Sequence, residues 1–280
     1  MSAGSAPRRI ILCADDFGLS DGVNRAILTL IGQRRINATS VMAVAPAFNR
    51  GSATTLRDAA AENGCQIGLH LTLTAPFRPL TMHFRPLQND TFLALPQLLR
   101  ASVLWRLDRD ILHAEILAQL AAFKAAFGRP PDYVDGHQHA HAFPQVRDAF
   151  IDAVATAAPA AWVRQCGRAP AATRSAGDLK SLVLDILSSG FRARAAKAGV
   201  SFNPAFAGAY DFSKEPDFAT MFRRFLEGLP DRGLVMCHPG FVDDALVALD
   251  PLTTQREREY GFLASDQFPA LLAERNVALG

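Results

Sequence analysis

The sequence has no excess of charge of either sign. Its 29 Lys and Arg residues nearly balance its 27 Asp and Glu residues, and the formal net charge is only +2 over 280 residues. No block of like charges stands out from the rest of the chain. A protein that binds nucleic acid usually carries a strongly basic face or stripe. The composition therefore offers no support for a nucleic-acid partner.

Cysteine is scarce, and the cysteines that are present stand far apart. They form no Cys-x-x-Cys pair, and each lies in an apolar, strand-like stretch: Cys13, Cys65, Cys166 and Cys237. Closely spaced cysteines would indicate a disulfide framework or a metal site. We expect four buried free thiols in a protein from a reducing compartment.

Long hydrophobic runs are also missing. No apolar stretch approaches the ~20 residues that a membrane-spanning helix requires. Arg8 and Arg9 precede a short apolar run near the N-terminus, but Asp15 and Asp16 end this run where a signal peptide would have its cleavage site. We expect a cytoplasmic protein with no transmembrane segment, and a lipid-linked substrate stays open.

Short apolar runs alternate with longer helical patterns along the chain. The runs that we expect to form strands cover residues 10–13, 39–44, 65–71, 133–135, 161–164, 200–202 and 234–237. Such alternation is typical of a parallel sheet. Seven or eight units in a chain of this length fit an irregular (β/α) barrel, and a doubly wound open sheet is the alternative.

No linker divides the chain, so we predict a single domain over residues 1–280. The stretch 74–107 breaks the alternation, because it mixes four prolines with Phe77, Phe84, Phe92 and Trp105. A long segment with little regular pattern is often a functional loop. We expect a loop-rich insertion at about 74–107, either a lid over a site or an ordinary surface excursion.

Polar side chains stand at the carboxyl ends of four expected strands. They are Asp15 and Asp16 after the first strand, His70 in the third, the run 135–141 after the fourth, and His238 after the last. Active sites of parallel α/β proteins form at this edge of the sheet. We therefore expect the four groups to meet there.

Adjacent residues of a strand point to opposite faces, so Asp15 and Asp16 would normally be separated. At a strand end, where the backbone bends, both could face one cleft, although a turn cap is the alternative. In extended chain His137, His139 and His141 could point together, because alternate residues share a face.

One carboxylate and two imidazoles, from Asp16, His70 and His137, would suit a catalytic metal with open positions. Such a metal lowers the pKa of water and polarises a carbonyl. Asp15 would then suit the general base. His238, from the far end of the chain, would suit the acid that protonates the leaving group.

These residues lie in four motifs that resemble those of the YdjC/ChbG-like carbohydrate deacetylases, which include chitooligosaccharide and hopanoid-associated deacetylases. The motifs are Ala-Asp-Asp-Phe-Gly (14–18), Gly-Leu-His-Leu (68–71), Asp-Gly-His-Gln-His-Ala-His (135–141) and Met-Cys-His-Pro-Gly (236–240). They follow one another in the family order.

The resemblance implies an irregular (β/α) barrel of the polysaccharide-deacetylase type. It implies a Mg²⁺ or Zn²⁺ ion held by Asp16, His70 and His137, with Asp15 as base and His238 as acid. It further implies that the protein removes an acetyl group from an N-acetylated amino sugar, in an oligosaccharide or a lipid-linked glycan, and forms a homodimer.

The third motif departs from the family pattern, because Gly136 stands where a serine is familiar, while the histidine after it is kept. The run around that histidine also differs from that of the hopanoid-associated members, so we assign no hopanoid substrate. Arg164, His139 and His141 are candidates for substrate contact. For Arg164, orienting Asp15 or forming a surface salt bridge are the alternatives.

Two other functions stay open at this point. The protein could be a metal-dependent hydrolase of another bond, such as a phosphoester or a glycosidic bond. Glycosidases usually use two carboxylates that flank the bond, and Asp15 and Asp16 are too close in sequence to do so easily. It could also be a non-catalytic protein that binds a sugar or a metal, although a candidate base and a candidate acid are both present.

Overall fold

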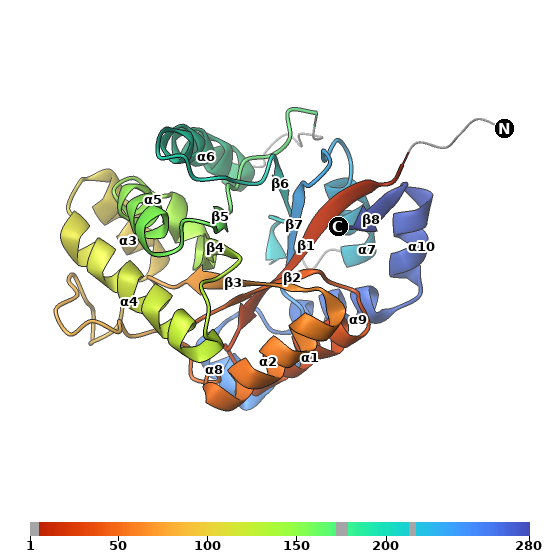
Figure 1. Cartoon of the computed structure of the whole chain (residues 1–280), viewed down its shortest axis with the longest axis horizontal. Coiled ribbons are helices and arrows are strands. Elements are labelled where there is room, and N and C mark those ends of the chain that lie inside the picture. Colours follow the sequence, from red (N-terminus) through yellow and green to blue (C-terminus); the bar gives the residue numbers. More distant parts are fainter. Residues whose placement is uncertain (1–5, 172–178, 213–216) are drawn as a thin grey trace.

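A parallel sheet lies at the centre of the molecule, and helices surround it (Figure 1). The computed structural model describes residues 6–171, 179–212 and 217–280. The strands are β1 (Arg8–Phe17), β2 (Ala38–Val41), β3 (Gln66–Leu71), β4 (Tyr133–Gly136), β5 (Trp162–Val163), β6 (Phe206–Ala207), β7 (Leu234–Cys237) and β8 (Val277–Leu279). Their order is β5-β4-β3-β2-β1-β7-β6, and β8 pairs with the start of β1.

Backbone hydrogen bonds connect each edge strand of this sheet to the chain segment beside the other edge strand. The Phe206 N–H donates to the carbonyl of Gly167 at 3.0 Å, and the Val163 N–H donates to Ser201 at 2.8 Å. The sheet therefore curves into an irregular (β/α) barrel, which confirms the predicted fold over the open-sheet alternative. The prediction of a strand at 200–202 was wrong. This segment forms only one isolated bridge, between Phe202 and Val163, and Pro204 separates it from β6.

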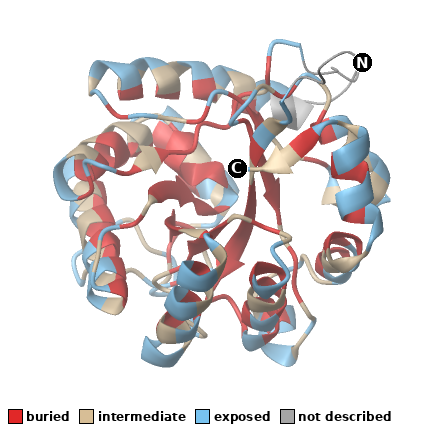
Figure 2. Cartoon of the chain, turned by 45° about the vertical axis from the view of Figure 1, so that its right-hand side comes forward, coloured by how far each residue is buried: buried red, intermediate tan, exposed pale blue. Residues whose placement is uncertain are grey.

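Ten α-helices are described. They are α1 (Asp21–Gly32), α2 (Arg50–Asn63), α3 (Leu95–Val103), α4 (Arg109–Phe127), α5 (Val146–Ala157), α6 (Leu179–Lys197), α7 (Phe218–Phe225), α8 (Asp244–Leu249), α9 (Thr254–Ala264) and α10 (Gln267–Glu274). Their buried faces turn toward the sheet (Figure 2). Within the described ranges, no helix combines the length and the apolar composition that crossing a bilayer would require.

The segment 74–107 packs against the domain and contains a helix, α3, that we did not predict. The backbone N–H groups of Leu80 and Thr81 both donate to the Glu115 carboxylate on α4, at 3.0 and 2.9 Å. Phe84 and Phe92 are buried and meet edge to face at 4.9 Å. The segment is thus tied to α4 by hydrogen bonds and filled by its own aromatic rings.

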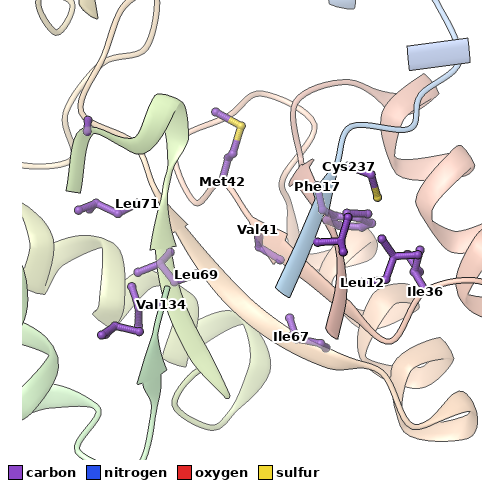
Figure 3. Close-up of a cluster of buried hydrophobic side chains, with 14 of the residues drawn as sticks. Leu12, Phe17, Ile36, Val41, Met42, Ile67, Leu69, Leu71, Val134 and Cys237 are labelled. Atoms are coloured by element: carbon purple, nitrogen blue, oxygen red, sulfur yellow. The ribbon is translucent and has the colours of Figure 1, made fainter. Parts of the chain in front are cut away.

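Apolar side chains from neighbouring strands fill the interior beneath the candidate site. Leu12, Val41, Leu69 and Val134, from four consecutive strands of the sheet, are all fully buried (Figure 3). This packing fixes the strand ends and so the polar residues that follow them. All four cysteines lie in the described part of the chain, buried and without a disulfide, as predicted.

Candidate active site

A distortion at the end of β1 turns Asp15 and Asp16 toward the same pocket. Asp16 has a φ of 72°, in the left-handed region, and the β1–β2 register shifts between Ala14 and Phe17. A regular strand would send the two carboxylates to opposite faces. Because of this bulge, both side chains line one pocket, as expected for a bent strand end.

The pocket has a volume of about 520 Å³ and lies at the carboxyl edge of the sheet. Asp15 and Asp16 from β1, His70 from β3, His137 after β4 and His238 after β7 all line it. The four groups that the sequence placed at strand ends therefore meet in space. Residues 250–253, which connect α8 to α9, and residues 254–256 at the start of α9 form a further wall that we did not anticipate.

Asp16, His70 and His137 form the group best suited to hold a metal. Asp16 Oδ1 lies 3.3 Å from His70 Nε2 and 3.0 Å from His137 Nδ1. One ligand atom from each residue lies within 4.8 Å of the other two, and all three residues are buried. A carboxylate and two imidazoles suit Zn²⁺ and several other divalent ions.

The partners of His70 fit a metal ligand as well. Its Nδ1 lies 2.6 Å from Asp135 Oδ1, so its Nε2 is directed toward Asp16. Metal-binding histidines commonly donate their other N–H to a carboxylate in this way. Burial alone would lower the pKa of His70, but Asp135 and Asp15 raise it to about 10. The surrounding carboxylates thus favour a positive charge at this position.

Arg256 keeps the candidate metal carboxylate ionised. Burial would raise the pKa of Asp16, but the Arg256 guanidinium holds it well below its usual range. Arg256 Nη2 donates to Asp16 Oδ2 at 2.6 Å, and both side chains are buried. Asp16 is therefore an anion whose two oxygens face different partners.

Asp15 is paired on both oxygens with Arg164. The guanidinium nitrogens Nη1 and Nη2 donate to Asp15 Oδ2 and Oδ1, each at 2.6 Å. Burial would raise the pKa of Asp15, but Arg164 holds it well below its usual range. Arg164 is fully buried and does not line the pocket, so a surface salt bridge is ruled out. Its position supports the alternative in which it orients Asp15.

A second group of possible metal ligands is already bridged by a cation. Cys13, Asp15 and Asp135 bring ligand atoms within 4.8 Å of one another. Arg164 Nη2 lies 3.0 Å from Cys13 Sγ, 2.6 Å from Asp15 Oδ1 and 2.5 Å from Asp135 Oδ2. The guanidinium fills the place that a metal would take there, which leaves Asp16, His70 and His137 as the candidate site.

The histidine run after β4 is not extended, so the expected common orientation of its side chains is wrong. Residues 137–142 form a 3₁₀ helix in which Gln138 and His139 have left-handed φ values of 54° and 59°. Only His137 reaches Asp16. His139 also lines the pocket, with Nδ1 3.5 Å from Cys166 Sγ.

His141 turns away from the pocket into the core, where its Nε2 lies 2.9 Å from the Arg164 carbonyl. It is fully buried, so its position gives no support for substrate contact. A Cβ on Gly136 would lie 2.6 Å from His141 Nδ1. The imidazole therefore accounts for glycine in the third motif, because a serine at this position would collide with it.

His238 follows β7 on another side of the pocket. Its ring meets Phe212 edge to face at 5.4 Å, and its backbone N–H donates to Glu259 Oε2 at 2.5 Å. Burial lowers the pKa of His238 to about 4, against the opposing effect of Asp16 and Asp15. The imidazole is thus neutral near pH 7 and must gain a proton before it can act as an acid.

Two functional candidates on α9 escaped the sequence analysis. Arg256 contacts Asp16, and Glu259 contacts the backbone of His238. Both are fully buried, whereas Glu257 and Arg258 between them are exposed. The i, i+3 spacing of two opposite charges was the only signal, and it is equally common on solvated helices.

The fold and the pocket define a (β/α)-barrel protein whose candidate active site combines carboxylates and imidazoles at the strand ends. Comparison with known families is more specific. Residues 9–274 match the model of the YdjC-like protein family. The chain therefore belongs to the YdjC-like family, which confirms the resemblance of its four motifs.

Relatives and solved structures extend over nearly the whole chain. A chitooligosaccharide deacetylase of Yersinia pestis (strain Pestoides F) is 27% identical over 97% of this chain and 96% of its own length. A crystal structure from Enterococcus faecalis V583, of a protein named for a proposed role in cellobiose-phosphate cleavage, aligns with a TM-score of 0.72 at 20% identity. It covers 98% of this chain and 97% of the other. This structural likeness supports the fold.

Proposed function

We propose that the protein is a metal-dependent deacetylase that removes the acetyl group from an N-acetylated amino sugar. The observation that carries the proposal is the convergence of Asp16, His70 and His137 beside Asp15, with His238 in the same pocket. The similarity to a chitooligosaccharide deacetylase supports the acetamide as the bond that is cleaved.

Asp16, His70 and His137 would hold the divalent ion, Mg²⁺ or Zn²⁺, which would lower the pKa of water and polarise the acetamide carbonyl. Asp15 accepts a proton from the attacking water, and its pairing with Arg164 keeps the carboxylate ionised and fixed. His238 donates a proton to the departing amine after it has gained one, because it is neutral at rest. Release of acetate and a free amino sugar completes the reaction.

The pocket geometry supports this reaction over hydrolysis of a glycosidic bond. Asp15 is held by Arg164 and Asp16 by Arg256, so neither carboxyl is positioned as a protonated general acid. A glycosidase needs one carboxyl of its pair in the acid form. A cytoplasmic location, a lipid-linked substrate and a homodimer remain predictions.

The test is acetate release from a panel of N-acetylated mono-, oligo- and lipid-linked sugars, with metal analysis of the same protein samples. Phosphate release from sugar phosphates is measured in parallel. We expect acetate from at least one amino sugar. Phosphate release without acetate would instead support the other hydrolase, and metal binding without either product would support a non-catalytic binding protein.

A further inference from the structure

Arg256 occupies a position that none of the four motifs covers. It lies near the start of α9, it is fully buried, and its guanidinium reaches the end of β1. Its Nη2 donates to Asp16 Oδ2 at 2.6 Å and to Asp250 Oδ2 at 2.7 Å. Its Nε donates to the Leu252 carbonyl at 2.9 Å. The guanidinium is therefore held from three directions.

The aliphatic part of Arg256 is confined as well. A Cβ on Gly240, the last residue of the fourth motif, would lie 3.2 Å from Arg256 Cδ. The Gly240 N–H donates to the Arg256 carbonyl at 3.2 Å. Because the side chain is already ordered by these contacts, it can hold a partner in one orientation without a further loss of conformational entropy.

The partner so held is Asp16, and its two oxygens are divided between two tasks. Oδ2 accepts the hydrogen bond from Arg256, while Oδ1 faces His70 Nε2 and His137 Nδ1. A free carboxylate can bind a divalent cation through one oxygen or both. The hydrogen bond turns Oδ2 toward Arg256 and leaves Oδ1 as the oxygen that faces the two imidazoles.

We propose that Arg256 is a positioning residue that restricts Asp16 to a single metal-binding oxygen. The inference rests on the proposed function, in which Asp16 is a metal ligand. One-oxygen binding leaves an additional position for water or for the substrate carbonyl, which a catalytic metal site requires. The hydrogen bond from Arg256 also makes the Asp16 carboxylate a weaker electron donor, so a metal held there would be a stronger Lewis acid.

The test is a crystal structure of the full-length wild-type protein with Zn²⁺ added, together with zinc X-ray absorption spectra of variants. We expect Asp16 to bind Zn²⁺ through Oδ1 alone. In Arg256→Met the zinc should gain an oxygen neighbour, and acetate release should fall ~10–100-fold. Arg256→Lys keeps a donor for Oδ2 and should retain the wild-type coordination.

Arg258→Met is the matched control, because it removes the same charge from an exposed position on the same helix. It should change neither the zinc spectrum nor acetate release. Zinc bound by both oxygens of wild-type Asp16, or unchanged coordination in Arg256→Met, would overturn the role of Arg256 alone. A wild-type protein that binds no divalent metal would overturn both this role and the proposed function.

Discussion

Asp15 and Arg164 form a bidentate salt bridge in the interior of the protein, with each carboxylate oxygen 2.6 Å from a different guanidinium nitrogen. The geometry fixes the plane of the carboxylate next to Asp16. It also keeps Asp15 ionised despite complete burial, which is the state that a general base needs. The pair links the fold to the proposed chemistry, and the first two predictions address it.

Asp15→Asn should abolish the base without emptying the metal site. The amide keeps the shape of the side chain but cannot accept a proton from water, so acetate release should fall ~10²–10⁴-fold. Metal content should stay at the wild-type level, because Asp16, His70 and His137 are unchanged. Acetate assays and metal analysis of the same preparation test this prediction. A wild-type rate of acetate release in Asp15→Asn would refute the role of Asp15.

Arg164→Met should strongly destabilise the protein, because it leaves Asp15 and Asp135 as buried carboxylates without their cation. Breaking one side of a buried ion pair typically costs ~3–5 kcal/mol. Urea unfolding gives the free energy of unfolding. Arg223→Met is the control, since the Arg223–Glu274 pair is 42% and 54% exposed and its loss should cost under ~1 kcal/mol. An equal decrease in the free energy of unfolding of the two variants would contradict the structural role of Arg164.

Gly136→Ser should destabilise the protein through its contact with His141. The added Cβ would lie 2.6 Å from the imidazole, and overpacking of this kind costs ~1–3 kcal/mol. The double variant Gly136→Ser/His141→Ala should recover part of that loss, since the smaller side chain makes room. Urea unfolding of both single variants and the double variant gives the coupling energy. Strictly additive effects would show that His141 does not exclude the serine.

Glu259 should make stability depend on pH. Burial raises its pKa from 4.5 to about 7, against the hydrogen bonds from Tyr210 and the His238 N–H. The folded state therefore binds this proton more tightly than the unfolded chain, and the resulting stability is complete below pH 4.5. It is lost as pH rises through about 7, and a shift of this size corresponds to about 3 kcal/mol.

Glu259→Gln tests this directly, because the glutamine cannot titrate. Between pH 5 and pH 8 the free energy of unfolding should fall further in the wild type than in the variant. The other titratable groups are present in both proteins, so their contribution to the pH dependence cancels in the comparison. The same pH dependence in both would show that Glu259 titrates at an ordinary pKa.

The part of the site that follows from strand order was predictable from the sequence, and the part that depends on local backbone conformation was not. Parallel strands end at one edge, so His70 and His238 had to meet Asp16 once the alternation was recognised. His139 and His141 were expected beside His137, but the left-handed backbone at Gln138 and His139 turns them in other directions. The alternation of side chains along a strand cannot predict residues with left-handed φ. The order of the strands therefore predicted which residues meet at this edge, but it did not predict the conformation of the backbone after β4.

Arg256 and Glu259 illustrate a different limit. Both residues lie on α9, and charged residues on a helix usually face solvent. Only the tertiary packing of α9 against the ends of β1 and β7 shows that these two side chains are buried beside Asp16 and His238. A single sequence contains no measure of that packing.

The most direct test of the account is a metal titration of chelator-treated protein with acetate release as the readout. The account predicts that acetate release from an N-acetylated amino sugar that the protein cleaves rises in proportion to added Zn²⁺ or Mg²⁺, up to one ion per chain. It also predicts that His137→Ala binds the ion more weakly and stays inactive at that ratio. Acetate release that is unaffected by chelation, or equal in wild type and His137→Ala, would contradict it.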